Sequence, residues 1–177
     1  MSIVSPDYPG LQLWLPLNST SPAAKPGDTY QVRSAYSAGL VLSLNEFGVN
    51  EAKPAEVDHE WFRRRLAQIR RLRPYFQGDY YLLTPCVFDL DSWLVYQLIL
   101  PEKQEGAILA FRRPESPMTS GCFRLQGLDA AGTYTFEDAD GGPTLEASGQ
   151  ELMEEGLPLA IETPRASRLV FYRKATT

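Results

Sequence analysis

A single histidine limits the nucleophilic chemistry that this chain can perform. His59 is the only histidine in 177 residues, so a Ser-His-Asp or Cys-His unit would have to use it. It lies near the start of a predicted helix, and no Gly-x-Ser-x-Gly nucleophile motif is present. One histidine and two scattered cysteines, Cys86 and Cys122, also cannot build a Cys/His metal cluster. We therefore assign no catalytic residue and no metal ligand.

Four aspartates offer weak candidates for a cation site. Asp138-Ala-Asp140-Gly-Gly resembles the start of a calcium loop, but Pro143 stands where that loop requires glycine, so we interpret it as a hairpin turn. Asp89 and Asp91 could chelate a cation, yet they precede a predicted strand, where aspartate serves turns. No Gly-rich phosphate motif follows a strand, and we expect no cofactor.

The acidic residues do not define a glycosidase pair either. Hydrolysis of a glycoside needs two carboxyl groups facing one sugar, about 5–9.5 Å apart depending on the stereochemical outcome. The chain has 22 aspartates and glutamates, so chance pairs are easy to find and sequence spacing cannot single one out. We nominate none.

The composition of the chain argues against several further classes of function. The net charge of −5 argues against a general nucleic-acid or anionic-membrane binder, because both require a basic surface. The longest apolar stretch, 93–100, is too short to span a bilayer, and no signal-peptide core precedes the first basic residue, Lys25. Without a CxxC spacing, two reduced and buried thiols are a better interpretation than a disulfide. We expect a cytoplasmic protein.

The apolar runs in the first 53 residues predict strands of a parallel sheet. Two apolar runs, 11–17 and 38–44, are separated by a Ser/Pro/Gly-rich loop over Asn18 to Asp28. The second run is nearly continuous, which is typical of a strand covered on both faces. Two such strands cannot form a sheet core alone.

Residues from about Pro54 to Phe76 predict a long amphipathic helix. Phe62, Leu66, Ile69 and Leu72 recur at three- and four-residue spacing and mark a buried stripe. Six arginines crowd the same segment: Arg63, Arg64, Arg65, Arg70, Arg71 and Arg73. The acidic total favours a solvated outer face over a nucleic-acid recognition helix.

Short apolar runs at regular intervals follow from Tyr80 onward. The predicted strands are 93–100, 107–112, 122–126, 133–137, 157–162 and 168–173. Turn residues separate them, and a single helical turn is predicted over 150–156. Many short strands with this spacing indicate an antiparallel sandwich or barrel.

Three segments of the sequence are similar to a known family: Tyr8-Pro-Gly-Leu-Gln-Leu-Trp-Leu-Pro-Leu17, Tyr30-Gln-Val-Arg-Ser-Ala-Tyr-Ser-Ala-Gly-Leu40 and Ile69-Arg-Arg-Leu-Arg-Pro-Tyr-Phe-Gln-Gly-Asp-Tyr-Tyr-Leu-Leu-Thr-Pro85. They resemble the end of glycoside hydrolase family 36, the melibiase-type α-galactosidases. Further similarity covers Trp93, Tyr96-Gln97, Gly106 to Arg113, Leu125 to Leu128 and Gly149 to Gly156. The resemblance extends over nearly the whole chain and is strongest around Arg-Pro-Tyr-Phe-x-Gly-Asp-Tyr-Tyr.

The resemblance implies an α+β, mainly β fold in two domains. Residues 1–78 would supply the last two strands and the last helix of a (β/α)₈ barrel, and residues 79–177 a C-terminal antiparallel β-sandwich. The implied parent activity is retaining hydrolysis of α-galactosides, with the nucleophilic Asp upstream of Met1. Asp7 lies near the family's acid position, but the poor match around it gives no ground for transferring that role. Residues 18–28 are the one segment that such a barrel would place near the sugar, but their composition equally fits a plain surface connection, which is the interpretation we favour.

Two other classes remain open. A carbohydrate-binding module would use exposed aromatic rings to stack on sugars, with Trp93, Tyr96, Tyr80 and Tyr81 as candidates. A structural or interaction domain would instead need a partner to cover the two apolar N-terminal strands, and this partner could be a second copy of the chain.

Overall fold

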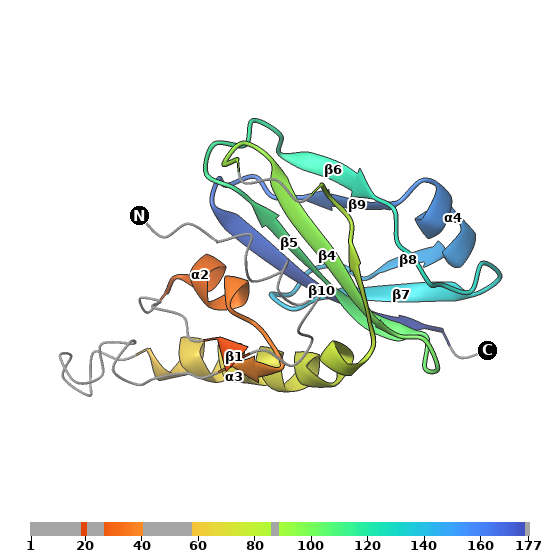
Figure 1. The fold of residues 1–177 in the computed structure, drawn as a ribbon, viewed down its shortest axis with the longest axis horizontal. Coiled ribbons are helices and arrows are strands. Elements are labelled where there is room, and N and C mark those ends of the chain that lie inside the picture. Colours follow the sequence, from red (N-terminus) through yellow and green to blue (C-terminus); the bar gives the residue numbers. More distant parts are fainter. Residues whose placement is uncertain (1–18, 21–26, 41–57, 86–88, 176–177) are drawn as a thin grey trace. The chain divides into compact units, whose positions relative to one another are not determined.

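The structure is a computed structural model that describes residues 19–20, 27–40, 58–85 and 89–175 (Figure 1). The chain divides into two compact units, Met1–Phe76 and Gln77–Thr177. The described part of the first unit holds short strands and helices, and the second unit is built mainly from antiparallel strands.

The first unit contains a short parallel β-α-β arrangement. Strands β1 (Ser19–Thr20) and β2 (Gly39–Leu40) pair in parallel, and helix α2 (Thr29–Ser34) lies between them in sequence. The Asp28 side chain caps α2 by accepting a hydrogen bond from the Gln31 amide at 3.0 Å. β1 falls inside the predicted loop 18–28, so that prediction is wrong at these two residues.

The predicted strands are described only in part. β2 covers two residues of the predicted run 38–44, and residues 41–44 lie outside the described ranges. The whole predicted strand 11–17 also lies outside them. Their membership of a barrel therefore stays a prediction.

Helix α3 (His59–Leu72) begins later than the sequence pattern around Pro54 indicated. The Asp58 side chain accepts a hydrogen bond from the Trp61 amide at 2.9 Å and so caps the first turn. A 3₁₀ helix, η2 (Arg73–Gln77), follows it.

The buried side of α3 is rotated from the predicted stripe. Ile69 and Leu72 are buried as predicted, but Phe62 and Leu66 are only half-buried. Arg65 and Gln68 are buried in their place because they bind α2: Gln68 Oε1 accepts from Arg33 Nε at 3.3 Å, and Arg65 Nη1 donates to Thr29 Oγ1 at 3.2 Å. Hydrophobic periodicity cannot detect a buried stripe that is half polar.

Replacing Ile69 by alanine should therefore destabilise the first unit. Deleting a buried isoleucine side chain lowers the free energy of unfolding by roughly 2–5 kcal/mol. Leu66→Ala should have a smaller effect, and Arg63→Ala, at an exposed position, should stay within about 0.5 kcal/mol. Urea denaturation followed by fluorescence, in variants that keep Trp61 as their only tryptophan, measures the difference. Trp61 reports on this unit because its Nε1 donates to Thr29 Oγ1 at 3.2 Å. Equal effects of all three changes would contradict the docking of α3 on α2.

The second unit has a six-stranded antiparallel sheet in the order β3-β4-β5-β10-β7-β8. Its strands are β3 (Asp79–Leu82), β4 (Trp93–Leu100), β5 (Glu105–Arg112), β10 (Ala166–Lys174), β7 (Thr133–Asp138) and β8 (Leu145–Ser148). A second sheet pairs β6 (Ser120–Phe123) with β9 (Leu157–Ala160). The structure thus confirms a mainly β, sandwich-like unit and adds the edge strands β3 and β8, which the sequence analysis missed.

Helix α4 (Gly149–Glu154) joins β8 to β9, close to the predicted helical turn. Ser148 and Glu151 form a reciprocal capping box at its start. Gly156 ends the turn with φ +96°, a left-handed conformation that favours glycine.

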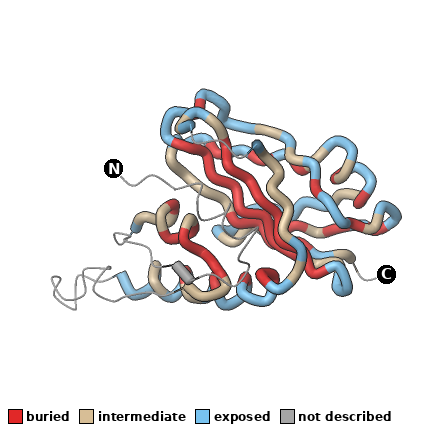
Figure 2. Tube along the Cα trace, in the orientation of Figure 1, coloured by how far each residue is buried: buried red, intermediate tan, exposed pale blue. Residues whose placement is uncertain are grey.

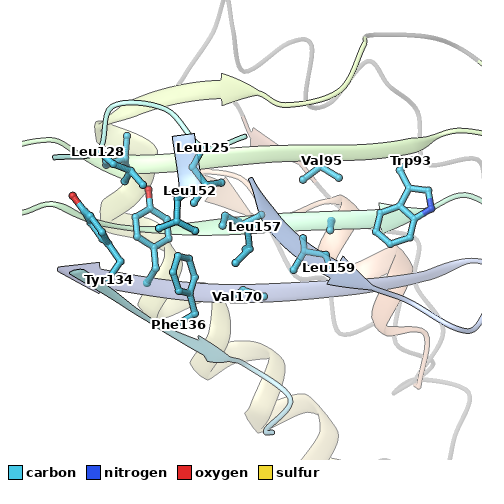
Figure 3. Close-up of a cluster of buried hydrophobic side chains, with 14 of the residues drawn as sticks. Trp93, Val95, Leu125, Leu128, Tyr134, Phe136, Leu152, Leu157, Leu159 and Val170 are labelled. Atoms are coloured by element: carbon cyan, nitrogen blue, oxygen red, sulfur yellow. The ribbon is translucent and has the colours of Figure 1, made fainter. Parts of the chain in front are cut away.

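One face of the large sheet packs against β6, β9 and α4 to form a hydrophobic core (Figure 3). The sheet contributes Trp93, Val95, Ile108, Phe136 and Val170, among others. The opposing layer contributes Leu125, Leu128, Leu152, Leu157, Leu159 and Ile161. Every member of this cluster lies in residues 93–172, so the second unit contains its own core.

Candidate functional site

The structure places His59 on the surface of the first unit. It is the first residue of α3 and is exposed to solvent. No group of three or more His, Cys, Asp or Glu side chains within residues 19–20, 27–40, 58–85 and 89–175 is placed to hold a metal ion.

The loop with Asp138 and Asp140 is a hairpin turn, as predicted. It connects the paired strands β7 and β8, and the Asp140 amide donates to Asp138 Oδ1 at 2.8 Å. The other carboxylate oxygen of Asp138 lies 2.6 Å from Arg168 Nη2. Asp138 is thus occupied by structural bonds.

Asp89 also serves a turn. Its Oδ1 accepts from the Ser92 amide at 3.1 Å and from the Ser92 hydroxyl. The hydroxyl bond is the main cause that lowers the pKa of Asp89 below its ordinary value, and Arg113 adds to it. Arg113 Nη1 donates to Asp89 Oδ1 at 3.3 Å and to the backbone carbonyl of Asp89 at 2.6 Å, so Asp89 anchors the entry to β4.

Two of the four aromatic candidates cannot act as sugar-stacking platforms because they are buried. Trp93 is 7% exposed, donates from Nε1 to the Met118 carbonyl at 2.9 Å and stacks on Phe123. Tyr96 is 1% exposed and stacks between Tyr80 and Phe111, with ring centroids 5.3 and 6.3 Å away. Tyr80 and Tyr81 are half-buried.

Cys122 departs from its predicted burial. It is a free, exposed thiol on β6, opposite the exposed Pro158 of β9, because the two-stranded sheet turns this side away from the core. A shallow pocket of about 300 Å³ lies here, lined by Ser120, Gly121, Cys122, Pro158, Leu159, Ala160 and Arg168. Its one charged lining residue, Arg168, is bound to Asp138. Cys86 lies outside the described residues.

Two buried arginines of the second unit went unnoticed in the sequence. Arg112 is 5% exposed and Arg113 is 2% exposed. Arg112 binds three carbonyl oxygens: Nη2 donates to Ser116 at 2.8 Å, and Nη1 to Ile161 at 3.1 Å and Glu162 at 2.6 Å. Burial of a charge is tolerated when its donors are bonded, and here they connect the end of β5 with the segment after β9.

The most distinctive feature of the second unit is that the second face of its large sheet is also buried. β4 and β5 are buried along nearly their whole lengths (Figure 2). A sheet with one face in solvent would instead show alternating buried and exposed residues along each strand. Strand registers place a set of side chains, all 0–2% exposed, opposite the core described above: Leu94, Tyr96, Leu98, Leu109, Phe111, Leu169 and Phe171. The sheet therefore has two apolar faces, as a middle layer does.

Solved structures with a similar fold include several α-galactosidases. The α-galactosidase from Lactobacillus brevis matches with a TM-score of 0.61 and 19% identity, over 83% of this chain and 20% of its own. The family 36 α-galactosidase AgaB from Geobacillus stearothermophilus matches with a TM-score of 0.61 and 19% identity, over 82% and 19%. The galactosidase domain of an α-galactosidase-sucrose kinase matches with a TM-score of 0.60 and 18% identity, over 82% and 19%.

The chain thus spans about one fifth of the length of these enzymes. No protein-family profile and no curated protein sequence matches it. Within the described residues, no helix has the length and apolarity to cross a membrane. Variants of a related Geobacillus enzyme, AgaA, have been solved with raffinose and with 1-deoxygalactonojirimycin. The resemblance to glycoside hydrolase family 36 is thereby confirmed at the level of the fold, which is that of a part of such an α-galactosidase.

Proposed function

We propose that this chain is the non-catalytic C-terminal region of a retaining α-galactosidase-like glycoside hydrolase, where it caps and stabilises a (β/α)₈ barrel. The observation that carries the proposal is the second apolar face of the sheet. A sheet buried on both sides needs a layer on each, and β6, β9 and α4 supply only one of them. The (β/α)₈ barrel that the family resemblance implies is the second layer we propose.

We propose that the chain comprises two domains of such an enzyme. Residues 1–78 contribute the end of the barrel, supported by the parallel β1–β2 pair with α2 between them. Residues 79–177 contribute the sandwich. The α-galactoside substrate belongs to the whole enzyme, and the unpaired thiol of Cys122 fits a cytoplasmic location.

The purified chain should not hydrolyse an aryl α-galactoside. Double displacement needs two carboxyl groups about 5–5.5 Å apart. Asp89 and Asp138 are engaged in structural bonds, and the proposal leaves the catalytic pair to the four fifths of the enzyme outside this chain. A colorimetric assay of the released phenol measures the result. Turnover that one Asp or Glu substitution abolishes would contradict the proposal.

Docking of the second face is tested with residues 77–177 alone. This fragment contains its whole core, so circular dichroism should show a folded β protein. Its uncovered second face should make it self-associate, because exposed apolar patches promote association. Leu94→Thr with Leu109→Thr should return it to a monomer in light scattering.

Val95→Thr with Ile108→Thr is the matched control. Val95 and Ile108 are the sequence neighbours of Leu94 and Leu109 and belong to the core cluster on the other face. A comparable change from an apolar side chain to threonine should therefore unfold the fragment without restoring a monomer. A wild-type fragment that is already monomeric would show that the second face needs no partner layer.

A further inference from the structure

The exposed side of α3 carries an unusual concentration of arginine. Six of the thirteen arginines of the chain lie between residues 63 and 73, and this stretch contains neither lysine nor an acidic residue. Four of them, Arg63, Arg64, Arg70 and Arg71, are exposed on the side opposite the buried Gln68, Ile69 and Leu72, and we call them the arginine face.

The spacing of the arginine face is regular. Arg63 and Arg70, and likewise Arg64 and Arg71, are seven residues apart, which places each pair two turns or about 10.5 Å apart along the helix. Ala67 lies exposed between the two pairs, so nothing bulky stands in the middle of the face. Glu60, 3.3 Å from Arg64 Nε, is the nearest carboxylate on the helix.

A face made only for solubility would look different. Such faces usually intersperse both signs of charge, and i,i+4 pairs of opposite sign stabilise the helix. Here six arginines against Asp58 and Glu60 leave +4 on residues 58–73, in a chain whose total is −5. Arginine, with its planar fork of donors, is also the cation suited to carboxylate or phosphate recognition, and lysine is absent.

We propose that the arginine face binds an acidic α-helical segment of a partner protein. Glutamates at positions i and i+7 of such a helix have the same spacing of about 10.5 Å as the arginine pairs, so two bidentate contacts form in register. The small Ala67 lets the partner helix approach closely. Local charge governs the contact, because charges separated by more than about 8 Å are screened at physiological salt.

A nucleic acid fits this face less well. A duplex carries a charge about every 1.7 Å over its whole length, whereas α3 offers its arginines over 14 residues only.

The test uses the full chain and a fluorescent helical peptide with glutamates at positions i and i+7. Fluorescence anisotropy should show saturable binding that weakens as salt rises. The triple variant Arg63→Gln, Arg70→Gln and Arg71→Gln should bind at least tenfold more weakly. The matched control, Lys103→Gln, Arg124→Gln and Arg173→Gln, removes the same charge from exposed positions of the second unit and should stay within twofold of wild type.

Two further measurements make the outcome decisive. Arg→Lys changes at positions 63, 70 and 71 keep the charge but remove the planar fork, and should weaken binding about threefold. A DNA duplex of equal length should bind more weakly than the peptide. Equal losses from the two Gln triples, no peptide binding at low salt, or tighter binding of the duplex would each overturn the proposal. Circular dichroism confirms that every variant is folded.

Discussion

Replacing Gly106 with alanine should prevent the second unit from folding stably. A Cβ atom at this position would lie 2.1 Å from the Leu98 carbonyl oxygen and 2.5 Å from the Tyr172 hydroxyl. Neither neighbour can move away freely, because one is the backbone of β4 and the other is a buried side chain of β10. We expect a loss of more than about 4 kcal/mol, the range reserved for severe clashes and broken buried networks.

The hydrogen bonds around Tyr172 explain the size of this effect. The Tyr172 hydroxyl accepts from Gln97 Nε2 at 2.7 Å and donates to the Leu98 carbonyl at 3.3 Å. Gln97, which is fully buried, also donates to the Gln126 carbonyl and accepts from the Gln126 amide, both at 2.9 Å. Displacing the tyrosine ring therefore leaves buried polar groups without partners, which is costly.

Gly121→Ala provides the matched control within another strand. A Cβ there would meet only the ring end of Phe123, at 3.0 Å, which can yield by a small rotation. Urea or thermal unfolding followed by circular dichroism should show a change within about 1 kcal/mol. Similar midpoints for the two variants would mean that the sheet accommodates a side chain at position 106.

The strands of the second unit were predictable where apolar residues and turn residues alternate. Trp93–Leu100 is a strand with the predicted bounds, and the strand predicted at 133–137 is one residue longer in the structure. β3 and β8 were missed because four-residue edge strands carry too little pattern. The second apolar face was hidden for a different reason: continuous burial erases the alternation that identifies a face.

Side-chain environments were less predictable than strands. Sequence composition indicated that Asp89 and Asp138 serve turns, and the structure confirms this. The exposure of Cys122 depends on which side of a two-stranded sheet meets the core, and this is decided by tertiary packing. The burial of Arg112 likewise depends on carbonyl groups 4 to 50 residues away in the chain.

Arg112 provides the second large effect that we expect. Arg112→Met keeps most of the side-chain volume but removes every donor, so the carbonyls of Ser116, Ile161 and Glu162 lose their partner. A hydrogen bond to a charged group contributes about 1.5–3 kcal/mol, and buried carbonyls left unpaired add to the loss. We expect the free energy of unfolding to fall by about 3 kcal/mol or more.

The part of the unit that loses stability in Arg112→Met distinguishes the loss of these hydrogen bonds from general destabilisation. Arg112 fixes both the turn around Ser116 and the residues that follow β9, so amide hydrogen exchange should accelerate first around 116–123 and 157–162. Arg112→Lys retains the charge but cannot reach three carbonyls with one ammonium group as well as the guanidinium fork does, and should have an intermediate effect. Arg124→Met, an exposed arginine beside β6, should change stability by no more than about 0.5 kcal/mol. If Arg112→Met is as mild as Arg124→Met, water replaces the guanidinium at these carbonyls and the sandwich is held together by its hydrophobic core alone.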